Sequence, residues 1–235
     1  ATAAITWNGN TIKNIRPFTG TTGGSGTQYG LYTSGAHASL TMNNNTIDSI
    51  TMNGTTTFYG FYAGGTNSGG GKTIQNNAFK NFNRAYGTSG SIYAVYSYGA
   101  AANGSNVTVN ISGNTVQNIN NSLATSSLIY CIYPYEYGTI GTNHAVVNVY
   151  SNVADNISSG YIYGVYGYYM AGTTASTPSK IYNNQFSRFT HYTTTQGAGI
   201  SVGYYSSNLS VYNNTIYAIS NASTAAATQM CGILV

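Results

Sequence analysis

The chain repeats one pattern of apolar and polar positions seven times, at intervals of 30 to 38 residues. Each repeat is centred on an asparagine, numbered here as position 0: Asn10, Asn45, Asn77, Asn114, Asn152, Asn184 and Asn214. Position −3 is always apolar: Trp7, Met42, Ile74, Ile111, Val149, Ile181 and Val211. Position +5 is also always apolar: Ile15, Ile50, Phe82, Ile119, Ile157, Phe189 and Ile219. Repeats of this length predict a solenoid in which each repeat forms one coil.

Positions −5 and +2 are apolar in most repeats, and only Lys72 and Ser179, both at −5, break the pattern. The two-residue step from −5 to −3 is the period of a strand with one buried face, whereas the step from +2 to +5 indicates a bend. Asparagine tolerates left-handed backbone angles. The chain is therefore expected to turn a corner near each asparagine, and asparagines stacked about 4.8 Å apart are expected to form a hydrogen-bonded ladder.

A second strand is predicted in each repeat by the pattern tyrosine, small residue, apolar residue, tyrosine. It reads Tyr29-Gly30-Leu31-Tyr32, Tyr59-Gly60-Phe61-Tyr62, Tyr93-Ala94-Val95-Tyr96, Tyr130-Cys131-Ile132-Tyr133 and Tyr163-Gly164-Val165-Tyr166, with degenerate versions near Gly199 and Cys231. If the apolar residue points inward, alternation along the strand places the following tyrosine on the outer face. This predicts an exposed strip that contacts a carbohydrate or a protein partner: Tyr32, Tyr62, Tyr96, Tyr133 and Tyr166. Further tyrosines extend it at Tyr98, Tyr135, Tyr137, Tyr168, Tyr169, Tyr204 and Tyr205.

The most consistent fold is an all-β, right-handed parallel β-helix of about seven coils, forming one domain over residues 1–235. Helical repeats would show apolar residues at spacings of three and four, and a propeller blade needs four strands with tight turns. The segments Leu40–Ile50, Ile181–Phe189 and Leu209–Ile219 resemble the right-handed parallel β-helix repeat of pectate-lyase-like proteins and many bacterial surface proteins. This resemblance implies the fold but leaves the function open, because lyases, glycosidases, tailspikes and adhesins share the repeat.

Charged residues make up only 4% of the chain, against about 25% in ordinary soluble proteins. A surface made of Asn, Thr, Ser, Gly and 24 Tyr points to an extracellular or cell-surface location. The seven basic residues are scattered, which disfavours nucleic acid as a partner. The sequence contains no run of 18 apolar residues, so a membrane span is not expected. The two cysteines, Cys131 and Cys231, fit no disulfide framework or metal motif and are expected to be small buried thiols.

Catalysis is not expected, and neither is a metal or a cofactor. A glycosidase needs two carboxylates roughly 5 to 9.5 Å apart. The chain has three acidic residues, of which Asp48 and Asp155 occupy position +3 three coils apart, about 14 Å at the strand spacing. Glu136 is expected to be a solvated loop charge, because acidic residues are rarely buried. A pectate-type lyase would need a calcium-binding acidic cluster, and the sequence shows none.

The expected function is structural or adhesive: the subunit or repeating body of a surface filament, stalk or adhesin. Neither end of the sequence shows the atypical polar cap that solenoids normally carry. We therefore expect copies to stack head to tail into a homopolymer, or further β-helix to continue the coils. The alternative is a carbohydrate-binding or tailspike-like module that recognises glycans through the tyrosine strip.

Overall fold

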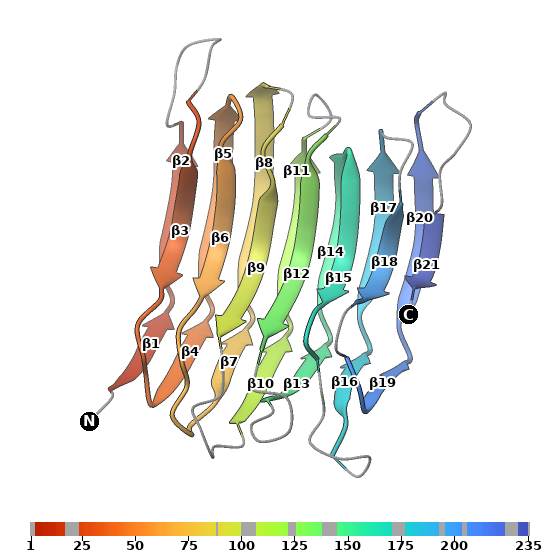
Figure 1. Cartoon of the computed structure of the whole chain (residues 1–235). Coiled ribbons are helices and arrows are strands. Elements are labelled where there is room, and N and C mark those ends of the chain that lie inside the picture. Colours follow the sequence, from red (N-terminus) through yellow and green to blue (C-terminus); the bar gives the residue numbers. More distant parts are fainter. Residues whose placement is uncertain are drawn as a thin grey trace.

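A computed structural model describes residues 3–16, 24–87, 89–99, 107–121, 126–137, 145–170, 177–192, 196–203, 206–223 and 230–234. These residues form 21 strands and no helix, arranged in three parallel sheets of seven strands each. The strands follow one another around an axis in about six turns, and the coils are stacked in sequence order from the N-terminal to the C-terminal end (Figure 1). The chain is therefore an all-β parallel β-solenoid, which confirms the predicted fold class.

Each coil contributes one strand to each sheet. The first sheet contains β1 (Ala4–Asn8), β4 (Ser39–Asn43), β7 (Lys72–Gln75), β10 (Val107–Ser112), β13 (Ala145–Tyr150), β16 (Ser179–Tyr182) and β19 (Leu209–Tyr212). The second contains β2 (Thr11–Ile15), β5 (Thr46–Asn53), β8 (Ala78–Tyr86), β11 (Thr115–Asn120), β14 (Val153–Ser159), β17 (Gln185–His191) and β20 (Thr215–Asn221). The third contains β3 (Thr27–Thr33), β6 (Thr57–Ala63), β9 (Ile92–Gly99), β12 (Leu128–Glu136), β15 (Tyr161–Gly167), β18 (Gly197–Val202) and β21 (Met230–Leu234).

The prediction of two strands in each coil was wrong, because the segment after the asparagine is itself a strand. Position +4 adopts a left-handed backbone in all seven coils: Asn14, Ser49, Asn81, Asn118, Asn156, Arg188 and Ala218. This residue interrupts the alternation, so that +2 and +5 both point inward although they lie three residues apart. The bend expected between these positions is therefore a bulge inside the second-sheet strand.

The corner near each asparagine is real, but the asparagine does not make it. The left-handed residue is the one before it, at position −1: Gly9, Asn44, Asn76, Gly113, Ser151, Asn183 and Asn213. Gly, Asn and Ser tolerate this conformation better than branched residues do. Each corner thus turns the chain from the first sheet into the second, and the position 0 side chain points into the coil.

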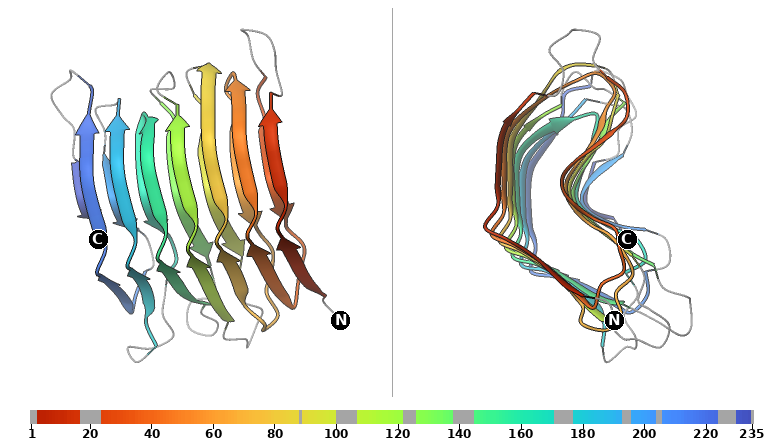
Figure 2. Two further views of the ribbon diagram at one scale, coloured as in Figure 1. Left: turned by 180° about the vertical axis from the view of Figure 1, so that it is seen from behind. Right: turned by 90° about the vertical axis from the view of Figure 1, so that its left-hand side faces the viewer.

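The core is a continuous apolar column along the axis. Its residues at positions −5, −3, +2 and +5 are almost completely buried in the middle coils, and residues of the third sheet close it from the other side. Viewed along the axis, the coils superimpose, and the wall that ends at the C-terminus, formed by the third sheet, bends inward (Figure 2). In the part of the chain that the structure describes, no helix has the length and hydrophobicity needed to cross a lipid bilayer.

Candidate functional site

The seven position 0 asparagines form one hydrogen-bonded ladder along the solenoid. In every pair of neighbouring coils, the backbone N–H and the Nδ2 of one asparagine both donate to the Oδ1 of the next, at 2.9–3.1 Å. The second Nδ2 proton goes to the position −3 carbonyl of the preceding coil, as from Asn45 to Trp7 O at 3.0 Å. Every hydrogen bond between two asparagines runs from the donors of one coil to the Oδ1 of the next, so the ladder has a direction.

The tyrosines of the third sheet cover its outer face in two columns, one on each side of the small residue. The predicted strip of Tyr32, Tyr62, Tyr96, Tyr133 and Tyr166 is the second column. Strict alternation would bury Tyr29, the first residue of the pattern. Instead, Gly30 and Leu31 both point inward, and Tyr29 and Tyr32 are 42% and 45% exposed. The first column therefore also faces outward, as Tyr29, Tyr59, Tyr93, Tyr130 and Tyr163.

The rings of these tyrosines contact one another along each column, and those of the first column are stacked. In the first column the ring centroids lie 4.5–5.5 Å apart with interplanar angles of 9–18°. In the second column the centroids lie 5.0–5.2 Å apart, and the rings are tilted by 36–81°. Sugars bind aromatic residues through the ring face, and in the first column these faces already contact a neighbouring tyrosine. Burial, together with neighbouring tyrosines, raises the pKa of Tyr62 to about 12, so its hydroxyl stays protonated at neutral pH.

A small pocket lies at the edge of this tyrosine face. It has a volume of about 190 Å³ and is lined by Ser34, Ala36, Tyr62, Gly65, Thr66, Tyr98, Gly99 and Tyr137. Tyr98 and Tyr137 have ring centroids 5.4 Å apart. The pKa of Tyr137 is raised to about 12, mainly by its hydrogen bond with Tyr98 and to a smaller extent by partial burial. The pocket therefore combines aromatic walls with hydroxyl groups and contains no charged side chain.

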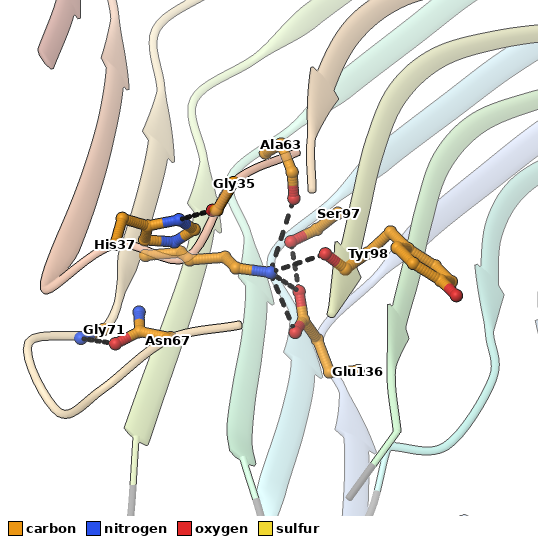
Figure 3. A network of polar contacts seen from close by, with 9 residues as sticks. Gly35, His37, Ala63, Asn67, Gly71, Ser97, Tyr98 and Glu136 are labelled. Carbon is orange, nitrogen blue, oxygen red and sulfur yellow. Dashed lines mark hydrogen bonds and ion pairs between the residues drawn. The ribbon is translucent and has the colours of Figure 1, made fainter. Parts of the chain in front are cut away.

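Next to the pocket residues Tyr98 and Gly99 lies a buried ion pair between Lys72 and Glu136, of which Glu136 is labelled in Figure 3. The Nζ of Lys72 lies 2.9 and 3.1 Å from the two carboxylate oxygens, and it also donates to the carbonyls of Ala63 at 3.3 Å and Tyr98 at 3.0 Å. The Ser97 hydroxyl donates to the same carboxylate. The prediction that Glu136 is a solvated loop charge was therefore wrong, because the residue is only 3% exposed.

The ion pair also explains why lysine interrupts the apolar column at position −5. Lys72 extends from β7 across the interior to the end of β12, one coil further along. The other exception, Ser179, is buried and accepts a hydrogen bond from the backbone N–H of Val147 at 3.0 Å. The contact of Lys72 and Glu136 holds the ends of neighbouring third-sheet strands, and an added Cβ on Gly99 would lie 2.8 Å from the Nζ. The pair thus holds the backbone at Tyr98 and Gly99, which line the pocket.

The other acidic residues lie on the surface of the second sheet. Asp48 accepts hydrogen bonds from Ser49 and Asn81, and Asp155 accepts them from Ser187 and Arg188. The register places both aspartates in one column, three coils apart. In the described residues, no group of three His, Cys, Asp or Glu side chains could hold a metal ion.

The remaining titratable residues are distributed through the solenoid. His37 is buried beside the ion pair, and its Nδ1 lies 2.9 Å from the Gly35 carbonyl oxygen (Figure 3). Cys131 is a buried thiol as expected, whereas Cys231 is partly exposed in the last coil. Tyr204 and Tyr205 lie outside the residues that the structure describes.

Comparison with known proteins adds no relative: no protein-family model, curated protein or solved structure matches this chain. The resemblance to pectate-lyase-like proteins is therefore not confirmed, and the structure shows the parallel β-solenoid itself.

Proposed function

We propose that this protein is a structural or adhesive element outside the cell, the body of a surface filament, stalk or adhesin whose coils continue by end-to-end stacking. The observation that carries this proposal is the direction of the asparagine ladder. Within the described residues, the Oδ1 of Asn10 accepts no hydrogen bond and the backbone N–H of Asn214 donates none. The first coil thus offers the acceptor that the last coil requires, as expected for a heterologous contact that does not close.

The end coils expose apolar side chains at positions that are buried in the middle coils. Ile12 and Ile216, at position +2, are only partly buried, whereas Ile47, Phe79 and Phe186 at the same position are 0% exposed. Ile15 and Ile233 are 40% and 49% exposed. Covering these side chains with another coil would stabilise the assembly by removing apolar surface from water.

A non-catalytic role is supported by the acidic residues. Glu136 is neutralised by Lys72 in the interior, and the carboxylates of Asp48 and Asp155 are separated by three coils and engaged in local hydrogen bonds. None of these arrangements provides the paired carboxylates of a glycosidase. The low charge of the surface favours association of copies.

Electron microscopy and sedimentation velocity of the purified chain at neutral pH test the proposal. Unbranched fibres with an axial repeat of about 34 Å, the height of seven coils at the strand spacing, are the expected result. A single sedimenting species of monomer size over the accessible concentration range would refute end-to-end stacking.

Carbohydrate recognition is a second candidate, favoured by the pocket next to Tyr62, Tyr98 and Tyr137. Its uncharged lining suits one neutral sugar ring. Saturation-transfer NMR with methyl glycosides of glucose, galactose, mannose and N-acetylglucosamine tests this function. Transfer to at least one glycoside should be lost in Tyr137→Ala and retained in Tyr212→Ala, which alters an exposed tyrosine of the first sheet. Absence of transfer from the wild-type protein would exclude the pocket as a site for these sugars.

A further inference from the structure

Neighbouring coils interlock through the small residue of the third sheet. An added Cβ on Gly30 would lie 2.4 Å from Ile47, on Gly60 2.8 Å from Phe79, on Gly164 2.7 Å from Phe186 and on Gly199 2.7 Å from Ile216. In each pair, the larger residue occupies position +2 of the next coil. Each of these four coils therefore presents a slot that the position +2 side chain of the following coil fills.

The last coil has the same slot, and it is open. Register places Gly232 opposite Gly199, because Ala198 pairs with Cys231 and Ile200 with Ile233. In the described part of the chain, an added Cβ on Gly232 would meet nothing within 4 Å. A hollow of about 290 Å³ lies there, lined by Ile216, Tyr217, Ala218, Ile219, Met230, Cys231 and Gly232.

We propose that this hollow is the socket for Ile12 of a second copy of the chain; this inference rests on the proposed end-to-end stacking. Ile12 is the position +2 residue of the first coil and belongs to the column of Ile47, Phe79 and Ile216. Among the described residues, no other coil supplies a slot for it. Placing Ile12 over Gly232 repeats the contact made between every pair of coils whose small residue is a glycine.

The same placement completes the asparagine ladder. With the first coil of one copy set on the last coil of another, the Asn214 N–H faces the Oδ1 of Asn10, and the Nδ2 of Asn10 faces the Val211 carbonyl. These are the donors and acceptors that every internal junction uses, such as that between Asn184 and Asn214.

Charge does not oppose this junction. The first coil carries Lys13 and Arg16, whereas the described residues of the last coil, 206–223 and 230–234, include no Asp, Glu, Lys or Arg. Like charges therefore do not meet, and the contact consists of apolar packing and neutral hydrogen bonds.

Gly232→Leu is the direct test, because it fills the socket from within. Gly35→Leu is the matched control, since an added Cβ there also meets nothing within 4 Å and its backbone is not left-handed. Sedimentation velocity over a concentration series should show that Gly232→Leu raises the concentration for half-assembly at least about tenfold, whereas Gly35→Leu leaves it within about twofold. Ile12→Ala should raise it at least about thirtyfold, since the lost side chain fills the socket from the other copy.

The outcomes separate this inference from the function on which it rests. Assembly of the wild-type chain that Gly232→Leu and Ile12→Ala leave unchanged would refute the socket while retaining end-to-end stacking. A wild-type chain that stays monomeric would refute both. Urea denaturation of each variant must show a folded protein, so that lost assembly is attributed to the junction.

Discussion

The buried pair of Lys72 and Glu136 allows a sharp test of how the interior is stabilised. Removing one partner leaves the other charge in a site that is 1–2% exposed, which costs about 3–5 kcal/mol. We expect this loss in Lys72→Leu and again in Glu136→Met. The double variant replaces both charges with apolar side chains, and leucine already occupies position −5 at Leu40 and Leu209. Its stability should lie within about 2 kcal/mol of the wild-type value.

The coupling between the two positions is therefore at least about 4 kcal/mol, since the single losses sum to about 6–10 kcal/mol. Urea denaturation at pH 7, followed by circular dichroism and tyrosine fluorescence, measures it if both probes give the same transition. Asp155→Asn is the control for a surface pair, because Arg188 is 59% exposed, and its cost should be under about 1 kcal/mol. A single variant that loses less than about 1 kcal/mol, or additive losses in the double variant, would refute the buried pair.

Three further substitutions test the ladder, the coil interlock and a buried histidine. Asn114→Ala removes a side chain that makes hydrogen bonds to Asn77, Ile74 and Asn152, and should lower the free energy of unfolding in urea by at least about 3 kcal/mol. The control is Asn120→Ala on the surface, which should lower it by under about 1 kcal/mol. Equal losses at the two sites would contradict a stabilising ladder. Gly60→Ala places a Cβ 2.6 Å from the Ala94 carbonyl oxygen and should lower the free energy of unfolding by about 1–3 kcal/mol. Gly35→Ala is the control and should be nearly neutral. An unchanged melting temperature in Gly60→Ala would show that the neighbouring coil moves to make room for a Cβ at no cost, and would contradict the interlock. Burial lowers the pKa of His191 to about 4, whereas its pKa in the unfolded chain is near 6.5. The stability of the folded protein is therefore not reduced by this residue above pH 6.5, and it falls as the pH drops from 6.5 towards 4, because the unfolded chain takes up the proton first. Urea titrations between pH 8 and pH 4 should show a smaller decline in the free energy of unfolding for His191→Gln than for the wild-type protein. The same pH dependence in both proteins would mean that His191 takes up its proton equally readily in the folded and unfolded states.

The sequence was most informative where one residue type must recur at one place in every coil. Stacked asparagines such as Asn77 and Asn114 satisfy each other only if they share a register, so the repeat identifies the ladder residues directly. The apolar positions define the core for the same reason. Parallel sheets follow because each column joins residues from consecutive coils.

The second-sheet strand of each coil and the polar interior were harder to foresee. A left-handed residue such as Ser49 or Arg188 breaks the two-residue period, which made the second-sheet strand resemble a bend. Lys72 and Glu136 are 64 residues apart, and their contact depends on how far β7 and β12 extend. The available signal for the ion pair was Lys72, which interrupts the apolar column, together with the small number of acidic residues that could neutralise it. The repeat pattern does not assign Glu136 a position that faces inward, so the partner could not be identified.

The left-handed residues at positions −1 and +4 separate the shape of a coil from its length. Because two fixed backbone angles set the path from the first sheet into the second, the repeats keep one cross-section although they differ by up to eight residues. Additional residues are accommodated in the connections between strands. Peptides inserted there in successive coils would be displayed in a row at intervals of about 4.8 Å, so the solenoid can hold several binding peptides at a fixed spacing for multivalent binding.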